Sequence, residues 1–301
     1  MRIGMPQYIN APVIWFNRTL FNHAGIPAPD QLEAAGNWTW QTLLEAAQRL
    51  TVRAADGSPL QYGFLTKYWS ANLISRPTWI WANGGNVFDF PSNPDRFVMD
   101  SPAAIEALEF VQDLIWRYGV VPKSYPVNER DAFRFVNGNL AMDDDGVDNY
   151  DNWAKTIGDS FEYGIAPRPM GTVSRGNRTS LDLWAVSARP RDIEATWTFL
   201  KFLVSSEIQQ LQAEITKRTP VRRSAMDAFI NLTHDIDLSV YLETAATAQV
   251  DPYSYIRRAS DFDRLIRPVL ESAIVRNEKP IRTALQEVSD AIRALYSEER
   301  R

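Results

Sequence analysis

The chain has 301 residues, 45% of them hydrophobic and 23% charged, and a formal net charge of −5. This composition predicts one large or two ordinary globular domains, and the acidic balance argues against a nucleic-acid partner, because phosphate-binding domains usually carry a basic excess. Since the sequence contains no cysteine, it has no disulfide, thiolate nucleophile, thiolate-bound zinc or lipid-modified cysteine.

Four amphipathic helices are predicted, because apolar residues recur every three or four positions after a capping residue or a proline. In chain order these helices cover residues 40–50, 102–118, 193–203 and 281–295. Their predicted starts are Thr39, Ser101-Pro102, Asp192 and Pro280, and Gly119 ends the second. Short apolar runs of strand length lie between them, at residues 13–16, 139–142, 163–166 and 183–186. This alternation predicts an α/β fold with a mainly parallel sheet.

The stretch from residue 167 to residue 180 is the best candidate for a long loop or a linker between lobes. It carries Arg168, Arg175 and Arg178, and no acidic residue follows them before Asp182. Two interpretations are open: the arginines are solvated in an exposed loop, or they contact a ligand or a partner.

Tryptophan is unusually frequent, with ten residues in the chain. Buried tryptophans pack well in a core, and exposed ones stack on the apolar faces of sugar rings. The composition leaves both roles open.

A series of short motifs extends along nearly the whole chain. The first motif spans residues 5–27 and has four consecutive parts. These are Met5-Pro6-Gln7-Tyr8, the apolar run at residues 13–16, Asn17-Arg18-Thr19-Leu20-Phe21 and Ala24-Gly25-Ile26-Pro27. The others are the turn Ala82–Gly85, the helix Asp100–Leu114, the run Ala132–Met142, the strand Leu183–Ser187, the helix Trp197–Leu203 and the element Thr219–Arg222. In their order and spacing these motifs resemble the sugar-binding group of bacterial extracellular solute-binding proteins.

The resemblance implies a type II periplasmic-binding-protein-like α/β fold with two lobes and crossing hinge segments. Residues 11–181 and 251–301 would form the C-terminal lobe, and residues 1–10 and 182–250 the interlobe crossings with a remnant of the N-terminal lobe. That lobe is expected to be incomplete, because in the family several βαβ units precede the first motif. We therefore expect the helix over residues 193–203 to expose an apolar face.

The resemblance also implies the substrate-binding component of an ABC importer, which binds a carbohydrate in an interlobe cleft without chemistry, cofactor or metal. Its expected partners are an oligosaccharide or sugar derivative and the transmembrane subunits of an ABC permease, and the chain itself is expected to be a monomer. A lipoprotein in the periplasm or at the cell surface is the family expectation. The sequence as given shows neither a secretory signal nor an apolar run of the roughly 18–20 residues that a membrane span needs.

The loops before and after the first strands supply predicted ligand contacts. Tyr8 and Asn10 lie in the loop before the first apolar strand, where Asn10 either contacts the ligand or satisfies a turn. Tyr68 and Trp69 lie in a loop between a strand and a helix, and by the resemblance this loop carries an aromatic ring that stacks on sugar.

A run of three carboxylates, Asp143, Asp144 and Asp145, follows an apolar strand and precedes Gly146. The carboxyl ends of parallel strands often hold site residues, and adjacent carboxylates repel, so at least one should meet a donor or stay solvated. Asp145 is the predicted acceptor for sugar hydroxyls. Asp148 stands where many relatives place a tryptophan, which favours a more polar or amine-bearing ligand. The spacing lacks the alternating ligands of a calcium loop.

The remaining candidates are aromatic residues and one acid. Trp79 and Trp81 are two residues apart on a helix, so at most one should reach the cleft, and Trp81 is the predicted contact. Asp182 and Trp184 border the returning strand, either as ligand contacts or as a capping carboxylate and a core tryptophan. Phe262 lies where relatives often place another stacking aromatic residue.

Two other classes of function compete with solute binding. A carbohydrate-active hydrolase would use two carboxylates, for which Asp143–Asp145 are candidates. No nucleophile elbow, HExxH motif or phosphate-binding glycine loop is present, and His23 and His234 lie far apart in polar sequence. A non-transporting binding or scaffold protein is the third possibility.

Overall fold

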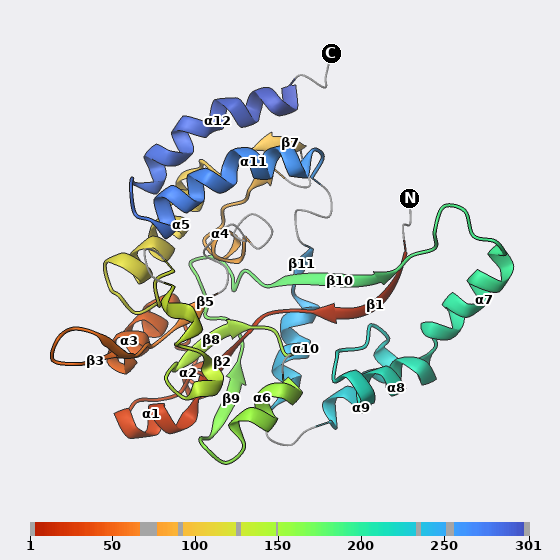
Figure 1. The fold of residues 1–301 in the computed structure, drawn as a ribbon, viewed down its shortest axis with the longest axis horizontal. Helices are drawn as coiled ribbons and strands as arrows, with labels where there is room; N and C mark the ends of the chain where they lie inside the picture. The colour runs from red at the N-terminus through yellow and green to blue at the C-terminus, as the bar shows by residue number, and fades with distance from the viewer. Residues whose placement is uncertain are drawn as a thin grey trace.

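The computed structural model describes residues 4–66, 77–89, 93–124, 128–148, 150–232, 236–250 and 256–297. Figure 1 shows the arrangement of its helices and strands. The helices are α1 (Arg18–Ala24), α2 (Pro29–Ala34), α3 (Trp40–Leu50), α4 (Thr78–Ala82), α5 (Pro102–Trp116), α6 (Tyr150–Ile157), α7 (Ile193–Leu203), α8 (Ser206–Thr216), α9 (Met226–Ile230), α10 (Leu238–Ala246), α11 (Ala259–Leu270) and α12 (Ile281–Ser297). The strands are β1 (Met5–Asn10), β2 (Val13–Asn17), β3 (Val52–Arg53), β4 (Pro59–Gln61), β5 (Leu65–Thr66), β6 (Phe88–Asp89), β7 (Asn93–Phe97), β8 (Met142–Asp145), β9 (Tyr163–Ala166), β10 (Arg178–Trp184) and β11 (Gln249–Val250).

The central sheet has the strand order β5-β8-β2-β9, and it is mixed, so the prediction of a mainly parallel sheet is wrong. β2 runs antiparallel to both β8 and β9, whereas β5 runs parallel to β8. The alternation of helices and strands does not reveal strand direction, because the neighbours of β2 are β8 and β9, which come more than 100 residues later in the chain. A smaller sheet has the order β1-β10-β11, in which β1 is antiparallel to β10.

The central sheet is buried on both faces, with a separate hydrophobic cluster on each. All residues of β2 are buried, and alternate side chains point to opposite faces. Ile14 and Phe16 belong to the first cluster, with residues of α3, α5, α11 and α12. Val13 and Trp15 belong to the second, with residues of α8, α9 and α10. The second cluster therefore joins segments that the sequence assigned to different lobes, and the lobe boundaries stay a prediction.

The predicted strands at residues 13–16 and 163–166 are confirmed, and the other two are displaced along the chain. β8 begins at Met142, where the apolar run ends, and its remaining residues are the three aspartates. β10 ends at Trp184, so it lies mostly before the apolar run at residues 183–186. Hydrophobicity located β8 poorly because this strand buries three charged side chains, and Asp144 among them is paired with the distant Arg168.

The four predicted helices are confirmed as α3, α5, α7 and α12. The Thr39 side chain accepts a hydrogen bond from the Thr42 amide, and the Asp192 side chain accepts one from the Ala195 amide. Gly119 follows α5 in the left-handed conformation, with φ of 61°. None of the described helices combines the length and the apolar character needed to cross a membrane.

Helix α7 exposes large apolar side chains, as the sequence predicted. Leu200 is its buried residue, whereas Trp197, Phe199 and Phe202 are 44%, 60% and 54% exposed. The helix lies at the edge of the molecule, beyond one end of the paired strands β1 and β10 (Figure 1). Exposed aromatic residues on one helix form the kind of patch that a soluble monomer normally covers.

The exposure of α7 predicts a contrast between two substitutions. The double change Phe199→Ser and Phe202→Ser should leave the free energy of unfolding within about 0.5 kcal/mol of wild type, because exposed side chains contribute little. It should also lower the fluorescence of a bound hydrophobic dye. Leu200→Ala should cost about 2–4 kcal/mol, because Leu200 is 7% exposed. Urea denaturation measures the free energy of unfolding of both variants. An equal loss of this free energy in the two variants would contradict the exposure of Phe199 and Phe202.

Candidate functional site

Two strands from distant parts of the sequence place Tyr8 beside Asp182. The two residues are register partners across β1 and β10. The Tyr8 hydroxyl hydrogen bonds to the Asp182 carboxylate and accepts a hydrogen bond from Nη1 of Arg218. The guanidinium carbon of Arg218 lies 4.5 Å from the centre of the Tyr8 ring. The hydrogen bond to Asp182, followed by burial, raises the pKa of Tyr8.

A second polar pair joins the end of β1 to the segment that follows β8. The Asn10 side chain donates from Nδ2 to the Asp148 carboxylate. Gly146 lies against the same amide, since a Cβ atom added at Gly146 would lie 2.7 Å from Asn10 Oδ1. Trp15 donates from its indole nitrogen to the Gly146 carbonyl at 3.0 Å. The turn after β8 is therefore held close to the end of β1.

These two pairs lie on one face of β1, because Tyr8 and Asn10 are two positions apart on a regular stretch of strand. Asp182 is exposed, and the others are half-buried, so all can be reached from solvent. The group lies where the chain passes from β1 to β2, beside β10 (Figure 1). We name it the crossing cluster, and its members are Tyr8, Asn10, Asp148, Asp182 and Arg218.

The three aspartates of β8 are divided between the two faces of the central sheet. The register pairs Asp143 with Trp15 and Asp144 with Ile14, so Asp144 faces the first hydrophobic cluster and Asp143 and Asp145 face the second. All three side chains are buried. Asp145 accepts a hydrogen bond from the Gly146 amide at 2.9 Å. The alternation separates charges that the linear sequence places side by side.

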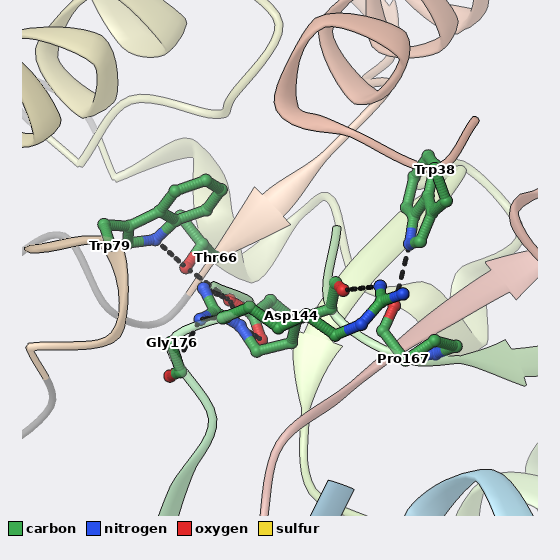
Figure 2. Close-up of polar contacts among 8 residues, drawn as sticks. Trp38, Thr66, Trp79, Asp144, Pro167 and Gly176 are labelled. Atoms are coloured by element: carbon green, nitrogen blue, oxygen red, sulfur yellow. Dashed lines mark hydrogen bonds and ion pairs between the residues drawn. The ribbon is translucent and has the colours of Figure 1, made fainter. Parts of the chain in front are cut away.

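Asp144 forms an ion pair with Arg168, and Figure 2 shows Asp144 between Thr66 and Gly176. Nε and Nη2 of Arg168 lie 3.2 and 3.1 Å from the two carboxylate oxygens, and both residues are at most 1% exposed. The Thr66 hydroxyl donates to the same carboxylate at 3.1 Å, and the Trp79 ring lies 5.0 Å below the guanidinium carbon. Burial raises the pKa of the Asp144 carboxyl, and Arg168 and Thr66 oppose that shift.

The segment from residue 167 to 177 is fastened to the molecule by its arginines. Arg168 donates to the carbonyl of Arg175 at 3.1 Å, and Arg175 donates to the carbonyl of Arg168 at 2.6 Å. Arg175 also pairs with Glu33 at 2.6 Å. Trp38 donates to the Pro167 carbonyl at 2.7 Å (Figure 2). The interpretation of a solvated arginine is therefore wrong for Arg168, which is 1% exposed and is paired with Asp144.

The other predicted ligand contacts lie away from the crossing cluster or outside the described part of the chain. Trp81 is 5% exposed, and its indole nitrogen donates to Asn86 at 3.0 Å. Phe262 is fully buried and packs edge-on against Phe88, with ring centres 5.0 Å apart. The structure therefore gives Trp81 and Phe262 packing roles in place of the predicted ligand contacts. Trp184 is half-buried opposite Met5, and Tyr68 and Trp69 lie outside the described residues.

Sequence reasoning missed two residues that complete the crossing cluster or support it. Arg218 precedes the Thr219-Pro220 motif, and Ile9 donates its amide to the Thr219 carbonyl at 3.2 Å, which brings Arg218 to Tyr8. Tyr241 donates from its hydroxyl to the Ile9 carbonyl at 2.8 Å. The motif at Thr219 was a usable signal for Arg218. Nothing local in the sequence indicates Tyr241.

Metal binding has no support in the described part of the chain. Among those residues, no three histidine, cysteine or acidic side chains are arranged so that they could hold a metal ion. The reason is visible in β8, where strand alternation sends neighbouring aspartates to opposite faces.

The mixed sheet covered by helices on both faces, with a second small sheet where the chain crosses, is compatible with the fold of the two-lobed solute-binding proteins. Residues 2–210 match the family model of the bacterial extracellular solute-binding proteins. The match covers most of the chain, which therefore belongs to this family.

Solved structures with the same type II periplasmic-binding-protein fold include several with bound solutes. An ABC substrate-binding protein of Listeria monocytogenes in complex with cycloalternan has a TM-score of 0.78 at 19% identity, over 98% of this chain and 72% of that one. UgpB from Mycobacterium tuberculosis in complex with glycerophosphocholine has a TM-score of 0.78 at 18% identity, over 100% of this chain and 72% of that one. The maltose-bound MalE3 protein of T. maritima has a TM-score of 0.73 at 23% identity, over 97% of this chain and 72% of that one.

The buried pair beneath β8 predicts an asymmetric response to substitution. Asp144→Asn should lower the free energy of unfolding by about 3–5 kcal/mol, because it leaves the buried charge of Arg168 without a counter-charge. Arg168→Met should lower the free energy of unfolding by less than Asp144→Asn at low pH, because the Asp144 carboxyl can take up a proton and become neutral. Urea denaturation of the two variants at matched pH measures the difference.

The pH dependence of Arg168→Met follows from the sign of the Asp144 shift. Without Arg168, burial holds the native-state pKa of Asp144 above its unfolded value of about 3.9. The native state then binds the proton more tightly, so stability is greatest below the unfolded pKa and falls as pH rises through the native-state pKa. The control is the double variant with Asp144→Asn, which lacks the titrating group. Parallel stability curves for the two proteins would contradict the assignment.

Proposed function

We propose that this chain is the substrate-binding component of an ABC importer and that it binds a carbohydrate, an oligosaccharide or a sugar derivative, without changing it chemically. The observation that carries the proposal is the crossing cluster. It presents carboxylates, an amide, a guanidinium and a tyrosine ring from β1, β10 and the turn after β8. Planar polar groups hold sugar hydroxyls, and an aromatic ring covers an apolar sugar face.

Membership of the solute-binding family supports this proposal, as do the solutes of the similar structures. Two of those structures hold carbohydrates, cycloalternan and maltose, and one holds glycerophosphocholine. The proposed binding mode is closure of two lobes about the crossing segments, which withdraws the solute from water. The proposed lobes are residues 11–181 with 251–301, and residues 1–10 with 182–250. The proposed partners are the transmembrane subunits of an ABC permease, at the periplasmic face or cell surface.

The hydrolase alternative has little support in the site chemistry. A glycosidase needs a carboxylic acid with a raised pKa within reach of the substrate. Burial raises the pKa of Asp144, but this residue is fully buried and bonded to Arg168 and Thr66. It therefore serves the fold, and binding without turnover is the better proposal.

The proposal predicts saturable binding that depends on the crossing cluster. A panel of neutral and amino sugars, tested by isothermal titration calorimetry, should include members that bind without product release. Asp182→Asn should weaken their binding by about 10- to 100-fold, because hydrogen bonds to charged groups contribute about 1.5–3 kcal/mol. Asp290→Asn is the matched control, since the Asp290 side chain is 97% exposed. Product release would favour the hydrolase, and a panel without any binding would favour a scaffold protein.

The close approach of Gly146 to Asn10 predicts a second effect on binding. Gly146→Ala should displace the Asn10 amide, because the new Cβ would lie 2.7 Å from its oxygen. The affinity for a bound sugar should fall by roughly fivefold, about 1 kcal/mol, as one hydrogen bond is misplaced. The melting temperature should change little, because the end of a side chain moves more easily than a backbone. An unchanged affinity would remove Asn10 from the binding site.

A further inference from the structure

A single buried hydroxyl holds the chain on both sides of Asn10. The Tyr241 hydroxyl donates to the Ile9 carbonyl at 2.8 Å and accepts a hydrogen bond from the Ala11 amide at 3.1 Å. Tyr241 and Ala11 are both fully buried. Because a tyrosine hydroxyl can donate one hydrogen bond and also accept one, this side chain satisfies a backbone group on each side of the same residue.

These two hydrogen bonds restrict the direction of the Asn10 side chain. The Ile9 carbonyl belongs to the peptide plane before the Asn10 Cα atom, and the Ala11 amide belongs to the plane after it. Because each peptide unit is planar, holding both planes restricts both backbone dihedrals of Asn10 and so the direction of its Cβ atom. The Asn10 amide donates to Asp148 and lies against Gly146, which leaves it little room to turn.

The hydroxyl lies at the passage of the chain from one sheet to the other. β1 ends at Asn10 and β2 begins at Val13, and these strands belong to different sheets. Tyr241 comes from α10, which lies beside this passage (Figure 1). The Ile9 amide also donates to the Thr219 carbonyl at 3.2 Å. The end of β1 is therefore held from two distant segments of the chain.

The segment that carries Tyr241 is itself fixed by packing and by hydrogen bonds. The Tyr241 ring packs against that of Phe229 in the second hydrophobic cluster, with ring centres 5.9 Å apart. Beyond the C-terminal end of α10, the Thr247 hydroxyl accepts a hydrogen bond from the Asn177 side chain at 2.9 Å, and the Gln249 amide donates to the Asn177 carbonyl at 2.9 Å. Asn177 directly precedes β10, so this segment contacts both β1 and the start of β10.

Packing accounts for the ring of Tyr241 but not for its hydroxyl. A phenylalanine ring would fill the same space, and a buried hydroxyl is unfavourable unless it is hydrogen-bonded. Burial raises the pKa of the Tyr241 hydroxyl, and the charge of Asp148 adds to that shift. The hydroxyl therefore keeps its proton and remains a donor to the backbone.

We infer that Tyr241 is a positioning residue of the crossing cluster, which directs the Asn10 amide by fixing the backbone on either side of it. The inference rests on the proposed function for its effect on binding, and it adds a residue that does not itself touch the solute, since Tyr241 is fully buried. Loss of the hydroxyl should free the Asn10 amide and leave every group that contacts the solute in the chain.

The test replaces Tyr241 by phenylalanine and uses a second buried tyrosine as the matched control. Tyr296 is 4% exposed, and its hydroxyl donates to the Arg257 carbonyl at 2.8 Å. Tyr241→Phe should speed the hydrogen exchange of the Ala11 amide by about tenfold, because this amide loses an acceptor. It should also shift the side-chain amide signals of Asn10 in the nuclear magnetic resonance spectrum. Tyr296→Phe should change neither.

Calorimetry with maltose and glucosamine measures the consequence for binding. The affinity of Tyr241→Phe for whichever of these sugars binds the wild type should fall by about five- to tenfold, because a misdirected amide makes a weaker hydrogen bond. Tyr296→Phe should bind as the wild type does. A purely structural role of Tyr241 would lower the melting temperature and leave both the Asn10 signals and the affinity unchanged.

Two results would overturn the inference and leave the proposed function standing: Asn10 signals that stay in place in Tyr241→Phe, or an equal loss of affinity in the two variants. If the Asn10 signals move but no member of the sugar panel binds the wild type, the proposed function falls and the positioning of Asn10 stands. Where Tyr241→Phe does not fold, Phe229→Leu carries the test, because the smaller side chain lets the Tyr241 ring move. Its Asn10 signals should then shift as well, and unchanged signals would overturn the inference.

Discussion

The ion pair between Asp144 and Arg168 is the constraint on which the geometry of the site depends. Burying two charges costs several kcal/mol per ion unless the geometry and the remaining hydrogen bonds compensate. Here the Thr66 hydroxyl and the carbonyls of Arg175 and Gly176 complete the contacts. Because each partner would be costly alone, β8, β5, α4 and the segment at residues 167–177 are held in a single arrangement (Figure 2).

Because side chains alternate along a strand, the ion pair of Asp144 with Arg168 also fixes the direction of the neighbouring side chains. With Asp144 fixed on one face of β8, Asp143 and Asp145 must project from the other, toward the second hydrophobic cluster. The turn after Asp145 then brings Gly146 against Asn10, and Asp148 accepts from the Asn10 amide. The ion pair therefore helps to position side chains that it does not contact, and the geometry of the site depends on the register of β8.

Local signals in the sequence predicted the helices well and selected four residues that the structure brings together in the candidate site. Thr39 and Asp192 cap their helices as expected, because capping involves residues three positions apart. Tyr8, Asn10, Asp148 and Asp182 were predicted and lie together. The position of β8 and the partner of Arg168 could not be predicted, because the charge that offsets the buried Asp144 comes from a residue 24 positions away.

The crossing cluster and the packed core beside β8 are held by different forces. The crossing cluster depends on polar contacts between β1 and chain more than 130 residues away, with Arg218 and Asp182 on Tyr8 and Asp148 on Asn10. The core beside β8 depends on aromatic packing. Exposed polar contacts rearrange more readily than a packed core. The crossing strands can therefore reorder when a solute binds, whereas the packed core beside β8 keeps its shape.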